Sequence, residues 1–210
     1  MYKRQEALLL RSAELHGCEF NPELLAIGRA GAGYNNIPIP DCTEHGIVVF
    51  NSPGANAEAV KELELCSLVM ASRDVLGSIG WVRGISGEGA AIPKLVEKGK
   101  SAFAGPELLG KTLGVIGLGA VGALVANIAL ELGMTVYGYD PFMSVDAAWR
   151  LSREVLRADS VDDIFRNSDY ISINVPYTEQ THHMLNAEAF AKMKRGVRIV
   201  NESRAEVVDD

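Results

Sequence analysis

Gly117-Leu118-Gly119-Ala120-Val121-Gly122 is the stretch that decides the fold of this 210-residue chain. The apolar residues 112–116 before it are expected to form a strand, and residues 120–132 after it are expected to form an amphipathic helix. Residues 135–139 are expected as the next strand, and Asp140 ends that strand. A glycine motif between strand and helix, with an acid at the end of the following strand, indicates a dinucleotide-binding βαβ unit.

Each glycine of this motif has a physical role. Gly117 permits a tight turn, Gly119 lets the backbone approach a pyrophosphate, and Gly122 lets helix and strand pack closely. The helix N-terminus adds unpaired N–H groups and a partial positive charge. The Asp140 carboxylate can accept hydrogen bonds from both adenosine-ribose hydroxyls and would repel a 2′-phosphate, so NAD is expected rather than NADP. The alternative is that the glycines only make a turn and that Asp140 only caps a strand.

The rest of the chain alternates apolar strands with helical segments. In the first part, strands are expected at residues 7–10, 24–27 and 47–50. A helix is expected from Asn56 to Gly77, with one face formed by Val60, Leu63, Ser67 and Met70. In the last part, we expect a strand at 170–175, a helix at 187–194 and a strand at 197–200.

This order predicts an α/β protein with a doubly wound parallel sheet of Rossmann type and a partial flavodoxin-like α/β substrate domain. We expect the substrate domain at residues 1–86 and the NAD-binding domain, incomplete at its C-terminus, at residues 111–210. Residues 87–110 contain several glycines, Pro93 and Pro106, and are expected to form a linker with a short helix at 92–97.

Composition narrows the function classes. The net charge of -7 and the pI of about 5.2 disfavour general binding to nucleic acid or to an anionic membrane surface. Cys18, Cys42 and Cys66 lack the spacing of a zinc site, and no metal is expected. The charged N-terminus and the absence of a long apolar run predict a cytoplasmic protein.

From about Ala7 to Asp210 the chain resembles the D-isomer-specific 2-hydroxyacid dehydrogenases. The segments that carry this resemblance are Leu10-Arg11-Ser12, Gly28-Arg29-Ala30-Gly31-Ala32-Gly33 with Asn35 and Asn36, Asn51-Ser52-Pro53-Gly54-Ala55-Asn56 with Glu62, the glycine motif, Val175-Pro176 with Thr181, and Asn201-Glu202-Ser203-Arg204.

The resemblance implies a substrate site in the first part of the chain. The backbone N–H groups of Gly31, Ala32 and Gly33 would bind the carboxylate of a 2-hydroxy acid. Arg11 and Ser12, with Arg29 nearby, match positions that family members acting on a phosphorylated acid use toward the phosphate. Lys61 would either add a phosphate contact or be a solvated helix position. The expected substrate is therefore a small anionic 2-hydroxy acid carrying a phosphate.

The resemblance also implies the catalytic and cofactor residues of the second part. Arg204 matches the catalytic arginine that holds the substrate carboxylate and polarises the reacting carbonyl. Val175, Pro176, Thr181 and Ser203 would line the nicotinamide side of the cofactor, and Ala120 and Val121 would lie over its pyrophosphate. By the same resemblance the protein would form a homodimer through the cofactor domain, with residues 90–109 reaching the partner chain.

Family members also use an acidic residue and a histidine that lie beyond the matching arginine, and the sequence ending at Asp210 contains neither. We therefore expect this chain to bind NAD but to turn over slowly or not at all, since loss of a general base costs about 100- to 10,000-fold in rate. Glu202 and Ala205 depart from residue types common beside that arginine, and His182 and His183 are expected to be ordinary solvated side chains. Glyoxylate, hydroxypyruvate or lactate as substrate, and a non-catalytic NAD-binding scaffold, remain the alternatives.

Overall fold

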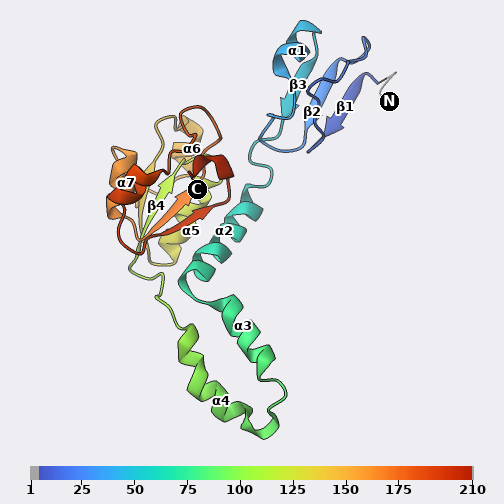
Figure 1. Ribbon diagram of the computed structural model, residues 1–210. Coiled ribbons are helices and arrows are strands. Elements are labelled where there is room, and N and C mark those ends of the chain that lie inside the picture. The colour runs from blue at the N-terminus through green and yellow to red at the C-terminus, as the bar shows by residue number, and fades with distance from the viewer. Residues whose placement is uncertain (1–4, 210) are drawn as a thin grey trace. The chain divides into compact units, whose positions relative to one another are not determined.

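The structure is a computed structural model that describes residues 5–209, and the chain divides into two compact units between Glu58 and Ala59. The first unit is a three-stranded parallel sheet in the order β1-β2-β3 (Figure 1). Its strands are β1 (Ala7–Leu10), β2 (Ala26–Arg29) and β3 (Val48–Asn51), and helix α1 (Ile39–Glu44) precedes β3. The three expected strands are confirmed, although the second lies at residues 26–29 and not at the expected 24–27.

A small apolar core holds the first unit together. Its buried side chains are Leu10, Leu15, Leu24, Ile27, Ile37, Cys42 and Ile47. The register places Leu10 beside Arg29 and Arg29 beside Asn51. Because the strands are parallel, the segments that follow these residues leave the sheet at the same carboxyl edge.

The second unit contains a five-stranded parallel sheet in the order β6-β5-β4-β7-β8. Its strands are β4 (Thr112–Ile116), β5 (Thr135–Tyr139), β6 (Leu156–Arg157), β7 (Tyr170–Ile173) and β8 (Arg198–Asn201). From β4 the chain adds β5 and β6 on one side of the sheet and then β7 and β8 on the other side, with all strands parallel. The position beside β4 where the direction of winding changes is the topological switch point of a doubly wound sheet. The Rossmann-type sheet predicted from the sequence is therefore confirmed.

Helices cover both faces of this sheet. They are α2 (Ala57–Ser72), α5 (Gly122–Glu131), α6 (Val145–Arg150), α7 (Val161–Asn167), α8 (Ala187–Lys192) and the short 3-10 helix η3 (Ala205–Val207). One apolar cluster joins Leu113 and Val115 of β4 to α2 and α5. A second cluster joins Ile171 and Ile173 of β7 to α7 and α8. Side chains alternate along each strand, so Tyr170 and Ser172 of β7 lie on the α2 face.

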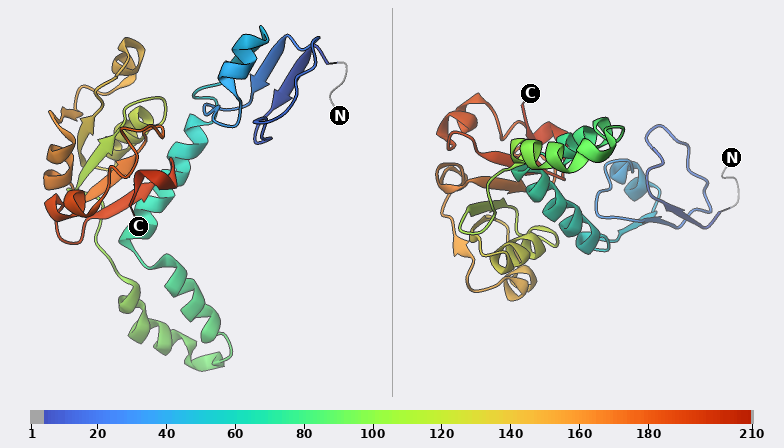
Figure 2. Two further views of the ribbon diagram at one scale, coloured as in Figure 1. Left: turned by 45° about the horizontal axis from the view of Figure 1, so that its top comes forward. Right: turned by 90° about the horizontal axis from the view of Figure 1, so that it is seen from below.

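Helix α2 packs against the sheet of the second unit, and the face that it buries is not the one expected. Leu68 and Glu64 are buried, whereas Leu63 and Met70 are exposed. Apolar and charged residues are not separated onto opposite faces of this helix, so the spacing of its apolar residues does not identify the buried face. The Arg198 Nε donates to the Ala71 carbonyl at 2.7 Å and ties the end of α2 to β8, which lie side by side in Figure 2.

The helix expected to run to Gly77 ends at Ser72, and a new helix, α3 (Val75–Gly84), follows. Asp74 causes the restart, because its side chain accepts a hydrogen bond from the Gly77 N–H and caps α3. The residues expected as a linker contain the 3-10 helix η1 (Gly89–Ala91), α4 (Ile92–Gly99) and the 3-10 helix η2 (Lys100–Phe103). The expected short helix is thus present and slightly longer.

The segment from α3 to η2 forms a helical hairpin, which we call the arm (Figure 1). The Trp81 and Phe103 rings lie 5.3 Å apart between centroids, and a Cβ on Gly99 would meet the Trp81 ring at 2.4 Å. Glycine is therefore needed where α4 crosses α3. Within residues 5–209 no single helix is both long and apolar enough to cross a membrane; α2 and α3 meet that length and composition only together, across a 67° bend.

Candidate functional site

The glycine turn between β4 and α5 is shaped by close backbone packing at two of its three glycines. Gly117 has φ of +88°, and a Cβ there would lie 2.6 Å from the Asn174 carbonyl oxygen. A Cβ on Gly122 would lie 1.9 Å from the Gly117 carbonyl oxygen. Both positions require glycine to bring helix α5 close to the sheet.

Gly119 differs from its neighbours, because nothing lies within 4 Å of the position that its Cβ would occupy. Internal packing therefore does not explain glycine at this position. The open space adjoins the first turn of α5, where the orphan N–H groups and the positive end of the helix dipole attract anions. A pyrophosphate fits here, so the residues present match a dinucleotide better than a purely structural turn.

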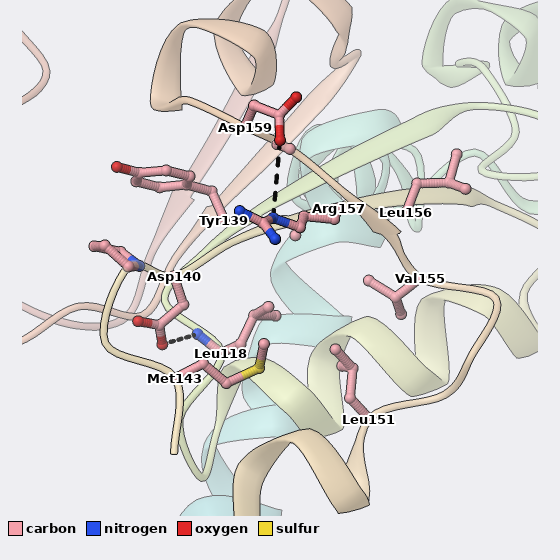
Figure 3. A pocket seen from close by; sticks show the side chains of 12 residues that line it. Leu118, Tyr139, Asp140, Met143, Leu151, Val155, Leu156, Arg157 and Asp159 are labelled. Atoms are coloured by element: carbon pink, nitrogen blue, oxygen red, sulfur yellow. Dashed lines mark hydrogen bonds and ion pairs between the residues drawn. The ribbon is translucent and has the colours of Figure 1, made fainter. Parts of the chain in front are cut away.

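Asp140 lies directly after β5, with its carboxylate held in place by two backbone groups. The Leu118 N–H donates to Oδ2 at 2.8 Å and the Phe142 N–H donates to Oδ1 at 2.8 Å. Figure 3 shows this carboxylate beside Leu118 and Met143, in a pocket of about 490 Å³. Each carboxylate oxygen has a second lone pair for a ribose hydroxyl, and the charge opposes a 2′-phosphate.

The opposite wall of this pocket comes from a part of the chain that the sequence analysis did not identify. Leu151, Val155 and the residues around β6 line it, including Arg157 and Asp159. Arg157 Nε lies 3.8 Å from Asp159 Oδ1, and both side chains are exposed (Figure 3). A two-residue strand is too short to produce a periodic pattern, so the only sequence signal was the apolar pair Val155-Leu156.

The residues expected on the nicotinamide side follow β7. Thr181 closes this loop, because its Oγ1 donates to the Pro176 carbonyl at 2.7 Å and accepts from the Thr178 N–H at 2.8 Å. Val175 packs against the apolar cluster beneath the loop.

His182 and His183 follow Thr181, and their rings stack with centroids 3.8 Å apart. The described residues contain no group of three side chains that could hold a metal ion.

Ser203 and Arg204 follow β8, the strand next to β7. The Asn201 Oδ1 accepts from the Ser203 N–H at 3.0 Å and from Ser203 Oγ at 2.7 Å. The Asn201 Nδ2 donates to the Arg204 carbonyl at 2.8 Å. Asn201 thereby fixes the backbone of Arg204, whose guanidinium is exposed and donates to the Ser203 carbonyl at 3.0 Å. Because β7 and β8 are parallel neighbours, Val175 and Ser203 emerge at the same edge of the sheet.

The expected substrate residues of the first unit gather at the carboxyl edge of its sheet. Gly31 has φ of +134°, and its N–H donates to Ser52 Oγ at 2.7 Å. The Asn51 Nδ2 donates to the Ala32 carbonyl at 2.8 Å. The N–H groups of Ala32 and Gly33 donate no hydrogen bond to another group among residues 5–209, so these two could bind an anion. Lys61 lies on α2 in the second unit.

Arg29 carries a further indication of an anion in the first unit. Its Nη1 donates to the Ala30 carbonyl at 3.0 Å, while its Nε is buried and finds no acceptor among residues 5–209. Buried guanidinium N–H groups are normally satisfied, so an unpaired one marks a place for an acceptor. Arg11 and Ser12, which follow β1, are both exposed.

A family model for the D-isomer specific 2-hydroxyacid dehydrogenase NAD-binding domain matches residues 79–210. D-3-phosphoglycerate dehydrogenase of Mycobacterium tuberculosis is 36% identical over 208 residues, which cover 98% of this chain and 37% of the relative. Hydroxypyruvate reductase of Thermotoga maritima is 39% identical over 192 residues, which cover 91% of this chain and 57% of the relative. The chain thus spans less than two thirds of the length of these relatives.

Solved structures give the same result. D-lactate dehydrogenase from Aquifex aeolicus, complexed with NAD and lactic acid, matches with a TM-score of 0.76 and 30% identity, covering 99% of this chain and 59% of that one. NAD-bound 3-phosphoglycerate dehydrogenase of Entamoeba histolytica matches with a TM-score of 0.71 and 28% identity, covering 97% and 57%. The chain belongs to the D-isomer specific 2-hydroxyacid dehydrogenase family and carries the family's NAD-binding domain.

Proposed function

We propose that this chain binds NAD across the glycine turn and works as part of a D-3-phosphoglycerate dehydrogenase. The reaction oxidises the C2 hydroxyl of 3-phosphoglycerate to the ketone of 3-phosphohydroxypyruvate, and it begins serine biosynthesis. The observation that supports NAD binding is the open space at Gly119, together with the Asp140 carboxylate that backbone N–H groups hold in place. The cytoplasm is the expected compartment, which the free Cys18, Cys42 and Cys66 fit.

Residues of the second unit would position the substrate against the cofactor. NAD, when bound, supplies the acceptor for the hydride that leaves C2. The exposed Arg204 guanidinium would bind the substrate carboxylate in a bidentate fashion and stabilise the charge that develops on the C2 oxygen. Ser203 and the loop from Val175 to Thr181 would shield the reacting face from water.

The residues of the first unit would recognise the phosphorylated acid. The N–H groups of Ala32 and Gly33 can bind a carboxylate, and the unpaired Nε of Arg29, with Arg11 and Ser12, suits a phosphate. Domain limits at residues 1–86 and 111–210, joined by 87–110, remain our proposal for how these functions divide.

Comparing two acids tests the phosphate assignment. Calorimetric titration of the NAD-loaded chain should show at least about tenfold tighter binding of 3-phosphoglycerate than of D-glycerate, because a charge-assisted hydrogen bond contributes about 1.5–3 kcal/mol. Arg29→Gln should remove most of the difference, and Lys61→Ala decides whether Lys61 contributes. Equal affinities for the two acids would remove the phosphate from the proposal.

A second candidate substrate is hydroxypyruvate, favoured by the 39% identity to hydroxypyruvate reductase. Phosphohydroxypyruvate, hydroxypyruvate and glyoxylate can each be supplied together with NADH. The loss of NADH absorbance then gives a kcat/KM for each compound and ranks the three as substrates. Robust turnover of any of them would exclude a scaffold without catalytic activity. NADH binding with no turnover would favour that scaffold for the chain by itself.

We also propose that the chain forms a homodimer through the cofactor domain, with the arm reaching the partner chain. Leu76, Ile79 and Val82 of α3 are exposed, and none of the arm's four helical segments has a buried residue among those described. A helical hairpin with an apolar face and no core of its own is typical of a surface that packs on another protein.

A further inference from the structure

Glu64 is a fully buried acid on helix α2. None of its surface is exposed, and neither carboxyl oxygen has a hydrogen-bond partner within the geometric limits among the described residues. A buried carboxylate without a partner is costly, so such a group keeps its proton unless a cation compensates it. Nothing in the proposed reaction uses this side chain.

Glu202 is a second acid close to this part of α2. It directly follows β8, and its Oε1 accepts a hydrogen bond from Ser67 Oγ at 2.8 Å. Ser67 lies one turn beyond Glu64 on α2, so the Glu202 carboxylate reaches the same helix. Two acids from distant parts of the sequence therefore lie within about one helical turn of each other, where the end of β8 meets α2.

The other groups around this position do not supply a counter-charge to Glu64. Ser172 and Asn174, from β7 and the residues after it, are neutral, and Asn174 Nδ2 donates to Ser172 Oγ at 2.6 Å. Arg198 of β8 is bonded to the Ala71 carbonyl, and the Tyr170 hydroxyl bonds Ser72 at 2.7 Å.

On its own helix, Lys61 lies one turn before Glu64 and is not bonded to its carboxyl group. Burial raises the pKa of Glu64 to about 7, the Glu202 charge adds to the rise, and the nearby polar side chains of Ser172 and Asn174 oppose it. The carboxyl group is thus poised to gain or lose a proton near neutral pH.

This cluster lies between two parts of the candidate site. Asn174 packs against the glycine turn, since its carbonyl oxygen is what prevents a side chain at Gly117. Glu202 directly precedes Ser203 and Arg204, whose backbones Asn201 holds. A change of charge at Glu64 therefore acts on the segment that carries Arg204.

We propose that the buried Glu64 carboxyl group holds a proton beside the Glu202 carboxylate and that its charge state positions the Ser203–Arg204 segment against α2. With the proton bound, Glu64 is neutral and the segment stays packed. When the proton leaves to solvent, two carboxylates face each other and the segment loosens. The catalytic consequence rests on the proposed role of Arg204, whereas the carboxyl pair itself needs no cofactor.

Hydrogen exchange on the ligand-free 210-residue chain tests the pair. Protection factors for amides 202–207, corrected for the intrinsic pH dependence, should fall about tenfold between pH about 6 and about 8. Glu64→Gln should keep them constant at the higher value, because it preserves shape without a titrating group. Glu62→Gln, an exposed acid on the same helix, is the matched control and should behave like the wild type.

Infrared difference spectroscopy gives a second, independent readout. The carbonyl band of a protonated acid should vanish with a midpoint near pH 7 and be absent in Glu64→Gln. Glu202→Gln removes the like charge and should lower this midpoint by about one pH unit. An unchanged midpoint in Glu202→Gln, or a persisting pH dependence in Glu64→Gln, would overturn the inference. Failure of NAD to bind would contradict the proposed function and leave both of these readouts intact.

Discussion

Gly119 and Gly122 stand in the same turn but are glycine for different physical reasons. A side chain on Gly122 would collide with the backbone of Gly117, whereas a side chain on Gly119 would point into open space. The sequence predicted a packing role for Gly122, which the close backbone contact there confirms, and a role in ligand approach for Gly119, which stays a prediction. The pair therefore separates folding from binding within four residues.

Two substitutions make this difference measurable. Gly122→Ala should lower the free energy of unfolding by about 1–3 kcal/mol, because the new Cβ overlaps backbone that cannot move aside. Gly119→Val should leave the unfolding midpoint in urea near that of the wild type and weaken NAD binding at least about tenfold, as seen by calorimetry. A Gly119→Val protein that binds NAD normally would show that the pyrophosphate does not lie at this turn.

Glu64 predicts an unusual pH dependence of stability. Because its pKa is raised from 4.5 to about 7 on folding, the folded protein binds more protons than the unfolded chain between these values. Stability therefore falls as pH rises from about 4.5 to 7, by about 3 kcal/mol from this group. Urea denaturation across this range should show the loss in the wild type and in Glu62→Gln but not in Glu64→Gln. A difference between wild type and Glu64→Gln that does not vary with pH would refute it.

At the scale of elements, the sequence predicted best where neighbouring patterns supported one another. Strands β4 and β5 and helix α5 carry an apolar run, a glycine turn and alternating burial, and each was expected within a few residues of its bounds. Helix α2 shows the limit, because its apolar and charged residues do not separate onto distinct faces, so the sequence did not show that Glu64 is buried and Leu63 exposed. Helices α1, α6 and α7 are six or seven residues long, too short for periodicity to reveal them.

Helix α7 did have a local signal that could have been used. Ser160 accepts a hydrogen bond from the Asp163 N–H, and the Asp163 side chain accepts one from the Ser160 N–H, which makes a capping box. Ser160→Ala should therefore destabilise the protein by about 1 kcal/mol in urea denaturation. Ser101→Ala, at an exposed position of η2, should change stability by less than about 0.5 kcal/mol. Equal effects of the two changes would mean that the cap does not stabilise α7.

At the scale of the whole molecule, the sequence pointed to candidate site residues more readily than to the residues that surround them. The glycine turn, Asp140 and the Arg204 segment could be proposed from the sequence because each follows the end of a predicted strand, and the structure places each of them there. The β6 wall of the pocket and the Glu64–Glu202 pair were missed, since both arise from residues brought together only by sheet order. The net charge of -7 makes local cations such as Arg29 and Arg204 necessary for any anionic substrate.

The proposed dimer makes a prediction about the arm. Light scattering after size exclusion should give a mass of twice 22.6 kDa for the wild type. Val82→Glu should shift this toward the monomer, because it places a charge in the apolar face of α3. Lys94→Glu, an exposed charge on α4, is the control for a change of charge in the arm and should remain dimeric. A monomeric wild-type protein at micromolar concentration would contradict the proposal.

The central claim is that a dinucleotide lies over the first turn of α5 with its adenosine ribose on Asp140. Calorimetric titration of the 210-residue chain with NAD and with NADP tests it most directly, using wild type, Asp140→Ala and Asp140→Arg. We predict that the wild type prefers NAD, that Asp140→Ala loses at least about tenfold in NAD affinity, and that Asp140→Arg shifts preference toward NADP. Folded variants that bind NAD and NADP exactly as the wild type does would contradict the account.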